Sequence, residues 1–219
     1  MRIHLKTTPN TENVPFNYQT KLIGTIHKWL GNNEIHNRMS LYSFSWLMNG
    51  KREVNGLSFR NGSSWFLSFY ESKYIKKITQ SIIDSPLMFY GMKVTEVTIE
   101  DIPDLSNKNY FLLGSPVFIK RLENGHYRHY TYEDPEACTL MEETLRHKME
   151  LAGLPDDPSL RISFDLSYSK KKVKLVRIHH IENKCSMCPL IIHGSPRTKA
   201  FAWTAGIGNL TGSSLGSIY

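Results

Sequence analysis

The sequence predicts an α+β protein built from two tandem ferredoxin-like (RRM-type) domains, at residues 1–103 and 104–219. Three observations lead to this prediction. Over the first half, apolar residues recur at strand and helix spacings in the order β-α-β-β-α-β. The second half repeats this order of elements less regularly. A glycine-rich loop lies near the end of the chain. The predicted order implies a sheet with one face free of helices.

The first half divides into four predicted strands and two predicted helices. Alternating apolar residues predict strands at residues 3–5, 41–49, 65–69 and 92–101, with a turn at Asn61-Gly62. Apolar residues at helical spacing predict one helix that Asn17 caps and Gly31 ends, and another over 74–83 that Pro86 closes. Tyr42, Phe44 and Trp46 alternate with serines, so they share one strand face. That face is interpreted as core, with base stacking as the alternative.

The second half begins with a polar linker at residues 104–109. Strands at residues 110–120 and 126–132 are predicted to form a hairpin around Asn124-Gly125. An amphipathic helix over 140–152 follows, ended by Gly153 and Pro155. A second predicted hairpin pairs residues 162–168 with 173–179 across a lysine-rich tip. The remaining predictions are strands at 188–193 and 215–219 and a short helix at 196–205.

The charge balance favours a phosphate-rich partner. A formal net charge of +7 and a pI near 9.2 attract polyanions, and nucleic acid is the commonest of these. Seven cations concentrate the charge and are predicted to bind RNA: Lys51, Arg52, Lys170, Lys171, Lys172, Arg197 and Lys199. A plain hairpin tip is the alternative explanation of the triple lysine.

The glycine-rich loop is the second indication of phosphate binding. Its predicted contact residues are Gly206, Gly208, Gly212, Ser213, Ser214 and Gly216. Glycines let a polyanion approach peptide N–H groups closely. The spacing matches neither a Walker loop nor the GxGxxG of dinucleotide folds, so a polymeric ligand is favoured over a mononucleotide. Ordinary turns beside strands are the alternative.

Cysteine usage and hydropathy indicate a reduced, cytoplasmic protein. Three cysteines are not expected to build a disulfide framework in a chain of this length, and neither a signal peptide nor a membrane span is predicted from the sequence. Cys185 and Cys188, near His179, His180 and His193, have a spacing that zinc sites use. Buried cysteines are the favoured interpretation, and no metal or other cofactor is predicted.

Two histidines form the candidate catalytic pair. His27 lies at the edge of the first helix's apolar stripe, and His36 lies in the polar segment that leaves this helix. Because imidazole both accepts and donates protons near neutral pH, such a pair can act as general base and general acid. On RNA, the base would take the proton of a 2′-hydroxyl, and the acid would protonate the departing 5′-oxygen. Surface or packing roles are the alternative.

Several collinear segments resemble one family. They are VPFNYQ at 14–19, the histidine after the first helix, LYSFSWLM at 41–48 followed by Lys51 and Arg52, LGSPV at 113–117, and the glycine-rich loop. Together they resemble the CRISPR-associated endoribonucleases of the RAMP superfamily that process precursor CRISPR RNA. The resemblance implies two ferredoxin-like domains and metal-independent cleavage of CRISPR repeat RNA. It also implies 2′,3′-cyclic phosphate and 5′-hydroxyl ends.

The resemblance also suggests roles for individual residues. His36 matches the family's general catalytic histidine, and His27 matches a position that holds Tyr or His among relatives. Ser40 stands near the place of a catalytic lysine, so Arg38 is the nearest candidate for stabilising transition-state charge. The loop departs from the family at 215–218, where relatives have an aromatic residue between glycines. A monomer or homodimer is expected. The rival function is a non-catalytic RNA-binding subunit of a CRISPR effector complex.

Overall fold

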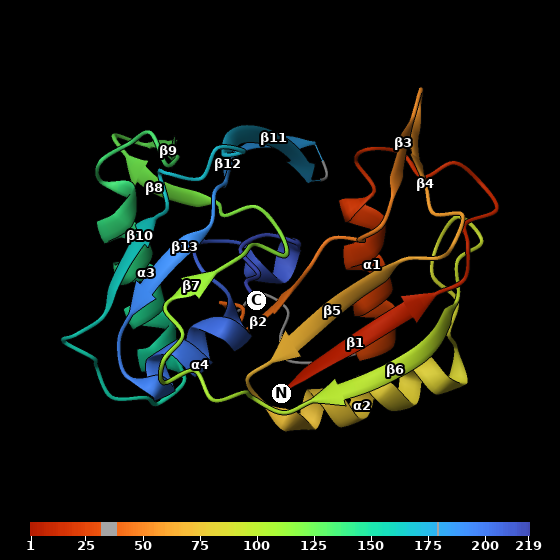
Figure 1. Cartoon of the computed structure of the whole chain (residues 1–219), viewed down its shortest axis with the longest axis horizontal. Helices are drawn as coiled ribbons and strands as arrows, with labels where there is room; N and C mark the ends of the chain where they lie inside the picture. Colours follow the sequence, from red (N-terminus) through yellow and green to blue (C-terminus); the bar gives the residue numbers. More distant parts are fainter. Residues whose placement is uncertain (32–38, 179) are drawn as a thin grey trace.

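The computed structural model describes residues 1–31, 39–178 and 180–219. Its first half is organised around a four-stranded antiparallel sheet in the order β2-β5-β1-β6. The strands are β1 (Arg2–Thr7), β2 (Tyr42–Phe44), β5 (Ser64–Phe69) and β6 (Val94–Glu100). The helices are α1 (Gln19–Leu30) and α2 (Ser72–Asp84), so the β-α-β-β-α-β prediction is confirmed (Figure 1).

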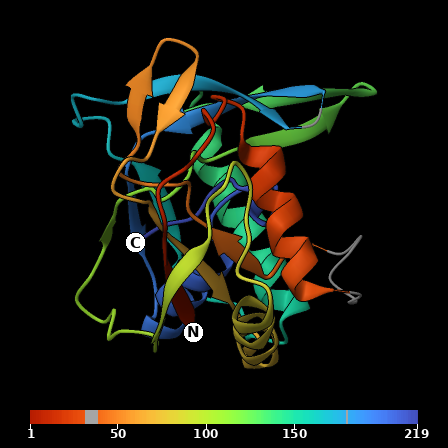
Figure 2. The same cartoon turned by 90° about the vertical axis from the view of Figure 1, so that its right-hand side faces the viewer.

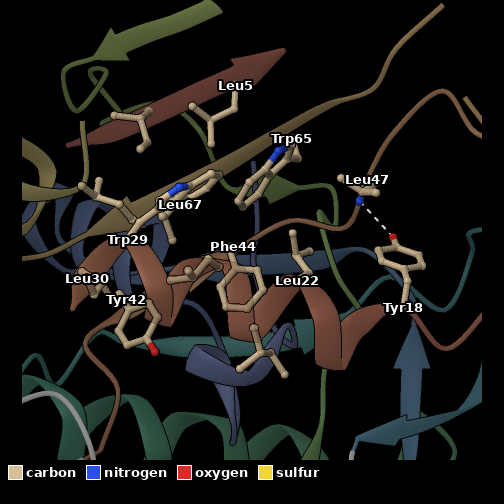
Figure 3. Close-up of a cluster of buried hydrophobic side chains, with 14 of the residues drawn as sticks. Leu5, Tyr18, Leu22, Trp29, Leu30, Tyr42, Phe44, Leu47, Trp65 and Leu67 are labelled. Carbon is tan, nitrogen blue, oxygen red and sulfur yellow. Dashed lines mark hydrogen bonds between the residues drawn. The ribbon is translucent and has the colours of Figure 1, made fainter. Parts of the chain in front are cut away.

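One face of this sheet and the two helices enclose the first core. The register sets Leu5 opposite Trp65 and Ile3 opposite Leu67, so apolar side chains gather on the helix side of the sheet. The Trp65 ring stacks on Trp29 of α1 with ring centroids 6.2 Å apart, and both rings are 1% exposed. Tyr42 and Phe44 are buried in the same core, which confirms their interpretation as core residues (Figure 3).

The start of α1 differs from the prediction. Tyr18, rather than Asn17, occupies the position before the helix, and no side chain caps it. The Tyr18 hydroxyl instead accepts a hydrogen bond from the Leu47 backbone N–H at 3.0 Å (Figure 3). Gly31, with φ of 59°, ends the helix as predicted and donates its N–H to the carbonyl of His27.

The other face of the sheet is covered by the C-terminal half, not left free of helices. Helix α4 (Pro196–Ala205) and the segment after it lie against this face. Ser43 donates to the Thr204 carbonyl at 2.9 Å. The Arg2 guanidinium lies between the rings of Phe66 and Trp203, 3.9 and 3.6 Å from their centroids. It also donates to the Trp203 and Ile218 carbonyls at 2.9 and 2.7 Å.

Arg2→Met is therefore expected to lower the free energy of unfolding by about 3 kcal/mol, because two buried carbonyls lose their donor at roughly 1–3 kcal/mol each. Chemical denaturation measures this loss. The matched control is Arg60→Met, since the Arg60 side chain is 74% exposed and forms an ion pair with Glu53 at 3.5 Å. A surface ion pair of this kind contributes at most about 1 kcal/mol. Equal losses in the two variants would contradict the role given to Arg2.

The second half contains helix α3 (Ala137–Leu151), α4 and several small antiparallel sheets. One sheet has the order β10-β13-β7, and the others here are the ribbons β8–β9 and β11–β12. The strands are β7 (Tyr110–Phe111), β8 (Ile119–Glu123), β9 (His126–Tyr130), β10 (Arg161–Phe164), β11 (Lys172–Ile178), β12 (Ile181–Met187) and β13 (Leu190–His193). A second core lies between these helices and strands.

Several second-half predictions are confirmed and one pairing is wrong. Asn124 and Gly125, with φ of 49° and 82°, form the two-residue turn of the β8–β9 hairpin. However, β10 pairs with β13, and β11 pairs with β12, so the predicted hairpin of residues 162–168 with 173–179 is wrong. Residues 215–219 are not a regular strand as predicted: Ile218 forms an isolated bridge with Leu113, and Tyr219 exchanges backbone hydrogen bonds with Leu112.

Two further features concern the organisation of the chain. A hairpin that the sequence did not predict, β3 (Lys51–Glu53) with β4 (Gly56–Ser58), lies between β2 and β5. The boundary between residues 103 and 104 stays a prediction. The first core includes Phe118, Val176 and Leu215 from the second half, so the two halves share buried contacts. Among the helices described, none is both long and apolar enough to cross a lipid bilayer.

Candidate active site

His27 opens onto a cavity of about 550 Å³ between the two halves of the chain. Helix α1 contributes His27, β8 contributes Lys120, and α3 contributes Thr144 and Lys148. The lining is completed by Met39, Ser40 and Tyr42 and by residues 208–213 of the glycine-rich loop. The cavity therefore joins the candidate histidine to the candidate phosphate-binding loop, with two lysines beside them.

Helix α1 places His27 at the border between core and solvent. Ile23, Ile26 and Leu30 of this helix are buried, whereas Lys28 is exposed. His27 itself is half-buried in the last turn, at the edge of the apolar stripe as the sequence predicts. A partly exposed imidazole beside a cavity can exchange protons with a bound ligand. His36 and Arg38 lie outside the described residues, so the structure places neither of them.

The glycine-rich loop is packed tightly against the rest of the protein. Gly206, Gly208, Gly212 and Gly216 are all buried. A Cβ added at Gly208 would lie 2.4 Å from the Phe118 carbonyl oxygen, and one at Gly212 would lie 2.3 Å from Ser40 Oγ. The N–H groups of Gly206 and Gly216 donate to the carbonyls of Ala202 and Pro116. These two glycines therefore shape the loop, while Gly208, Gly212 and Ser213 line the cavity.

Gly216→Ala is expected to destabilise the loop far more than Gly125→Ala. Both glycines have positive φ, of 68° and 82°, so each alanine pays about 1–2 kcal/mol for left-handed backbone. A Cβ at Gly216 would also lie 2.0 Å from the Ile207 carbonyl oxygen, whereas Gly125 has open space around it. Thermal unfolding of the two variants checks this. Similar shifts in unfolding temperature would contradict the tight packing of the loop.

Lys148 is a component of the site that the sequence analysis missed. Its side chain is 2% exposed, and Nζ donates to the carbonyls of Ala205 and Gly206 at 3.4 and 3.3 Å and to Thr211 Oγ1 at 3.1 Å. Burial lowers the pKa of this amine from 10.5 to about 7. The lysine thus joins α3 to the end of α4 and to the loop, and the Thr211 hydroxyl donates onward to the Ser40 carbonyl at 3.4 Å.

The other predicted RNA-binding cations lie outside this cavity. Arg52 lines a different cavity, and exposed Arg197 lines a third one beside Asp156. Lys51 is exposed at the start of β3, and Lys170, Lys171 and Lys172 lie at and just before the start of β11.

Lys199 requires a correction. It is 2% exposed, and its Nζ donates to the Ser106 carbonyl at 2.8 Å and to Asn109 Oδ1 at 3.1 Å. A lysine enclosed in this way is not available to contact RNA at the surface. It fixes the linker that precedes β7 to helix α4 instead.

Cys185 and Cys188 are both buried in the protein interior. Their Sγ atoms donate to the carbonyls of Asn183 and Asp165 at 3.4 and 3.3 Å. Burial raises the pKa of the two thiols, to about 12 and about 11. Within residues 1–31, 39–178 and 180–219, no three His, Cys, Asp or Glu side chains gather in a metal-binding group. The interpretation of Cys185 and Cys188 as buried cysteines is therefore confirmed.

Comparison with known proteins identifies the family. The family model described as "CRISPR associated protein Cas6, C-terminal" matches residues 99–218, more than half of the chain. The chain belongs to the Cas6 family. This membership supports a CRISPR-associated role of this Cas6 protein in RNA binding or processing. No curated protein matches its sequence.

Solved structures confirm the fold of this Cas6 chain. A protein described as "An RAMP protein binding different RNA substrates" matches with a TM-score of 0.85 at 20% identity, covering 100% of this chain and 98% of that one. A Cas6-related protein from Pyrococcus furiosus matches with a TM-score of 0.83 at 21% identity, covering 100% and 97%. At these identities the similarity establishes the tandem ferredoxin-like fold. The activity has to be inferred from the residues of the site.

Proposed function

We propose that this Cas6 protein is an endoribonuclease that binds CRISPR repeat RNA in precursor transcripts and cuts it. The observation that carries the proposal is the shared cavity, which brings half-buried His27 together with Lys120, Lys148 and residues 208–213 of the loop. An imidazole is the group suited to proton transfer near neutral pH, and the cationic lining attracts a phosphate. The loop and Lys120 would hold the strand while His27 moves a proton.

The proposed reaction uses the RNA's own hydroxyl as nucleophile. A general base takes the proton of the ribose 2′-hydroxyl, and the 2′-oxygen forms a bond to the adjacent phosphorus. The bond from phosphorus to the 5′-oxygen breaks, and a general acid protonates that oxygen. The products are a 2′,3′-cyclic phosphate and a 5′-hydroxyl. His27 and His36 are proposed as the acid and base, in either order.

The test compares two RNAs that differ by a single oxygen. Repeat RNA and the same RNA with one 2′-deoxy sugar before the scissile phosphate are each incubated with the protein in EDTA. The proposal predicts one cut in the first RNA, with a cyclic phosphate end identified by mass spectrometry, and none in the second. Cleavage that survives the deoxy substitution, or that EDTA abolishes, would refute the mechanism. Binding without any cleavage would favour the rival function of a non-catalytic RNA-binding subunit.

A further inference from the structure

A second cavity, of about 660 Å³, lies at the opposite end of α1 from His27. Residues 16–19 at the start of this helix, Trp46, the β3–β4 hairpin and residues 174–177 of β11 line it. Both views show the β3–β4 hairpin and the β11–β12 ribbon at the same end of the molecule (Figures 1 and 2). The volume falls in the range of about 300–1,000 Å³ that is typical of ligand sites. This second cavity is called the aromatic cleft below.

Two aromatic rings in the aromatic cleft each lie beside a cation. The Arg52 guanidinium carbon is 5.1 Å from the centroid of the Phe16 ring, and Lys174 Nζ is 4.5 Å from that of Trp46. Phe16 is 46% exposed, so its ring is accessible to a ligand in the aromatic cleft. A flat ring with an adjacent cation can stack on a nucleobase and at the same time contact the phosphate that follows it.

The charge in the aromatic cleft is not neutralised by the protein. No carboxylate pairs with Arg52 or Lys174 in the described part of the chain, whereas Arg177 pairs with Glu182 at 2.7 Å. The pKa of half-buried Lys174 is lowered by burial first and then by its cationic neighbours Lys172 and Arg52. Like charges held together around a cavity favour an anionic ligand.

We propose that the aromatic cleft binds a single-stranded segment of RNA, with bases stacked on Phe16 and Trp46 and phosphates next to Arg52 and Lys174. The proposal rests on the proposed function, because the segment would belong to the strand that is cut at His27. Tyr18 and His27 lie nine residues apart, which corresponds to roughly 14 Å along α1. Single-stranded RNA is specified because the bases of a duplex are stacked on each other and present no free face.

The aromatic cleft is also connected to the glycine-rich loop. Trp46 Nε1 donates to the Ser214 carbonyl at 2.8 Å, and Ser214 directly follows the short 3₁₀ turn Thr211–Ser213 of the loop. A base that stacks on Trp46 would therefore rest on a ring held by the same loop that lines the His27 cavity. For this reason Trp46 is left intact in the test, and Phe16 and Arg52 are replaced.

The test measures binding and cleavage separately. Affinity is measured with repeat RNA whose scissile position carries a 2′-deoxy sugar, and Phe16→Leu is expected to weaken it about fivefold to a hundredfold, since stacking contributes about 1–3 kcal/mol per base. Arg52→Gln should weaken binding and reduce its dependence on salt. The matched control is Tyr110→Leu, because Tyr110 is 43% exposed on β7 and lines neither cavity. This control should bind as the wild type does.

Crosslinking locates the RNA directly. Short oligouridylate carrying 5-iodouridine should crosslink on irradiation to peptides that contain Phe16 or Trp46, and duplex RNA should not. Unchanged affinity in Phe16→Leu and Arg52→Gln, or crosslinks confined to other peptides, would overturn the proposal. If the wild type cuts no RNA but Phe16→Leu still weakens binding, RNA binding in the aromatic cleft is supported and the proposed nuclease function is refuted.

Discussion

His27→Ala is expected to slow cleavage of repeat RNA about a hundredfold or more, because general acid or base catalysis contributes about 10²–10⁴ to the rate. The affinity for RNA should stay close to that of the wild type, since the loop and the lysines that line the cavity are unchanged. Single-turnover cleavage at saturating protein, combined with a binding isotherm on uncleavable RNA, separates the two quantities.

The matched control for His27 is His193→Ala. His193 is exposed at the end of β13, pairs in register with Arg161 and does not line the His27 cavity. This variant should cut RNA at the wild-type rate. A His27→Ala variant that loses RNA affinity or thermal stability while its bound RNA is cut at the normal rate would show that His27 has a packing role.

Lys148→Met is expected to slow cleavage at least tenfold without removing a group that touches the reacting atoms. Methionine fills a similar volume but cannot donate to the carbonyls of Ala205 and Gly206 or to Thr211, so the loop loses its link to α3. A displacement of about 1 Å in a positioning element can cost about a hundredfold in rate. Hydrogen exchange should rise in residues 205–214 of the variant, which a purely local packing defect in α3 would not cause.

The stability that Lys148 contributes should depend on pH with a definite sign. In the folded protein the pKa of this amine is about 7, whereas its ordinary value is 10.5. Between these values the unfolded chain holds a proton that the folded chain has released, so raising the pH favours folding. The free energy of unfolding of the wild type should therefore increase relative to Lys148→Met from about pH 7 upward. Below pH 7 the difference should level off.

Lys199→Met provides the control for burial itself. Lys199 is equally buried and also donates to a backbone carbonyl, but its partners Ser106 and Asn109 lie in the linker before β7. Its replacement should lower stability and leave the cleavage rate of bound RNA unchanged. If Lys199→Met and Lys148→Met slow cleavage equally, the effect of Lys148 is general destabilisation and the positioning role is wrong.

Local patterns in the sequence predict much of this fold. The helical periods gave both helices of the first half and α3, and Asn124-Gly125 located a hairpin turn. The prediction that β11 pairs with residues 162–168 was wrong because the apolar alternation from Ile162 through Tyr168 was interpreted as one continuous strand. The chain turns there: the backbone N–H of Ser167 donates to the Asp165 carboxylate at 3.0 Å. Strand β12 was missed because its polar residues at 182–184 show no alternation, and pairing with β11 stabilises it instead.

The candidate site was predicted only where its residue types are chemically distinctive. His27 and the glycines stand out in the sequence, whereas a lysine on a helix is usually a surface residue. A signal for Lys148 was present, since Met141, Leu145 and Lys148 share the buried face of α3 at helical spacing. Lys199 was wrongly predicted to bind RNA because it, too, was taken for a surface lysine on a helix. Its burial depends on the linker before β7, and no local pattern reports that contact.

The central claim is that the imidazole of His27 meets a ribose at the scissile phosphate. A crystal structure of the protein bound to repeat RNA with a 2′-O-methyl group at the cut site tests it most directly. The account predicts a ring nitrogen of His27 within about 3.2 Å of either the blocked 2′-oxygen or the 5′-oxygen that would depart. Ordered RNA whose scissile phosphate lies outside the His27 cavity, with the ring contacting protein alone, would contradict it.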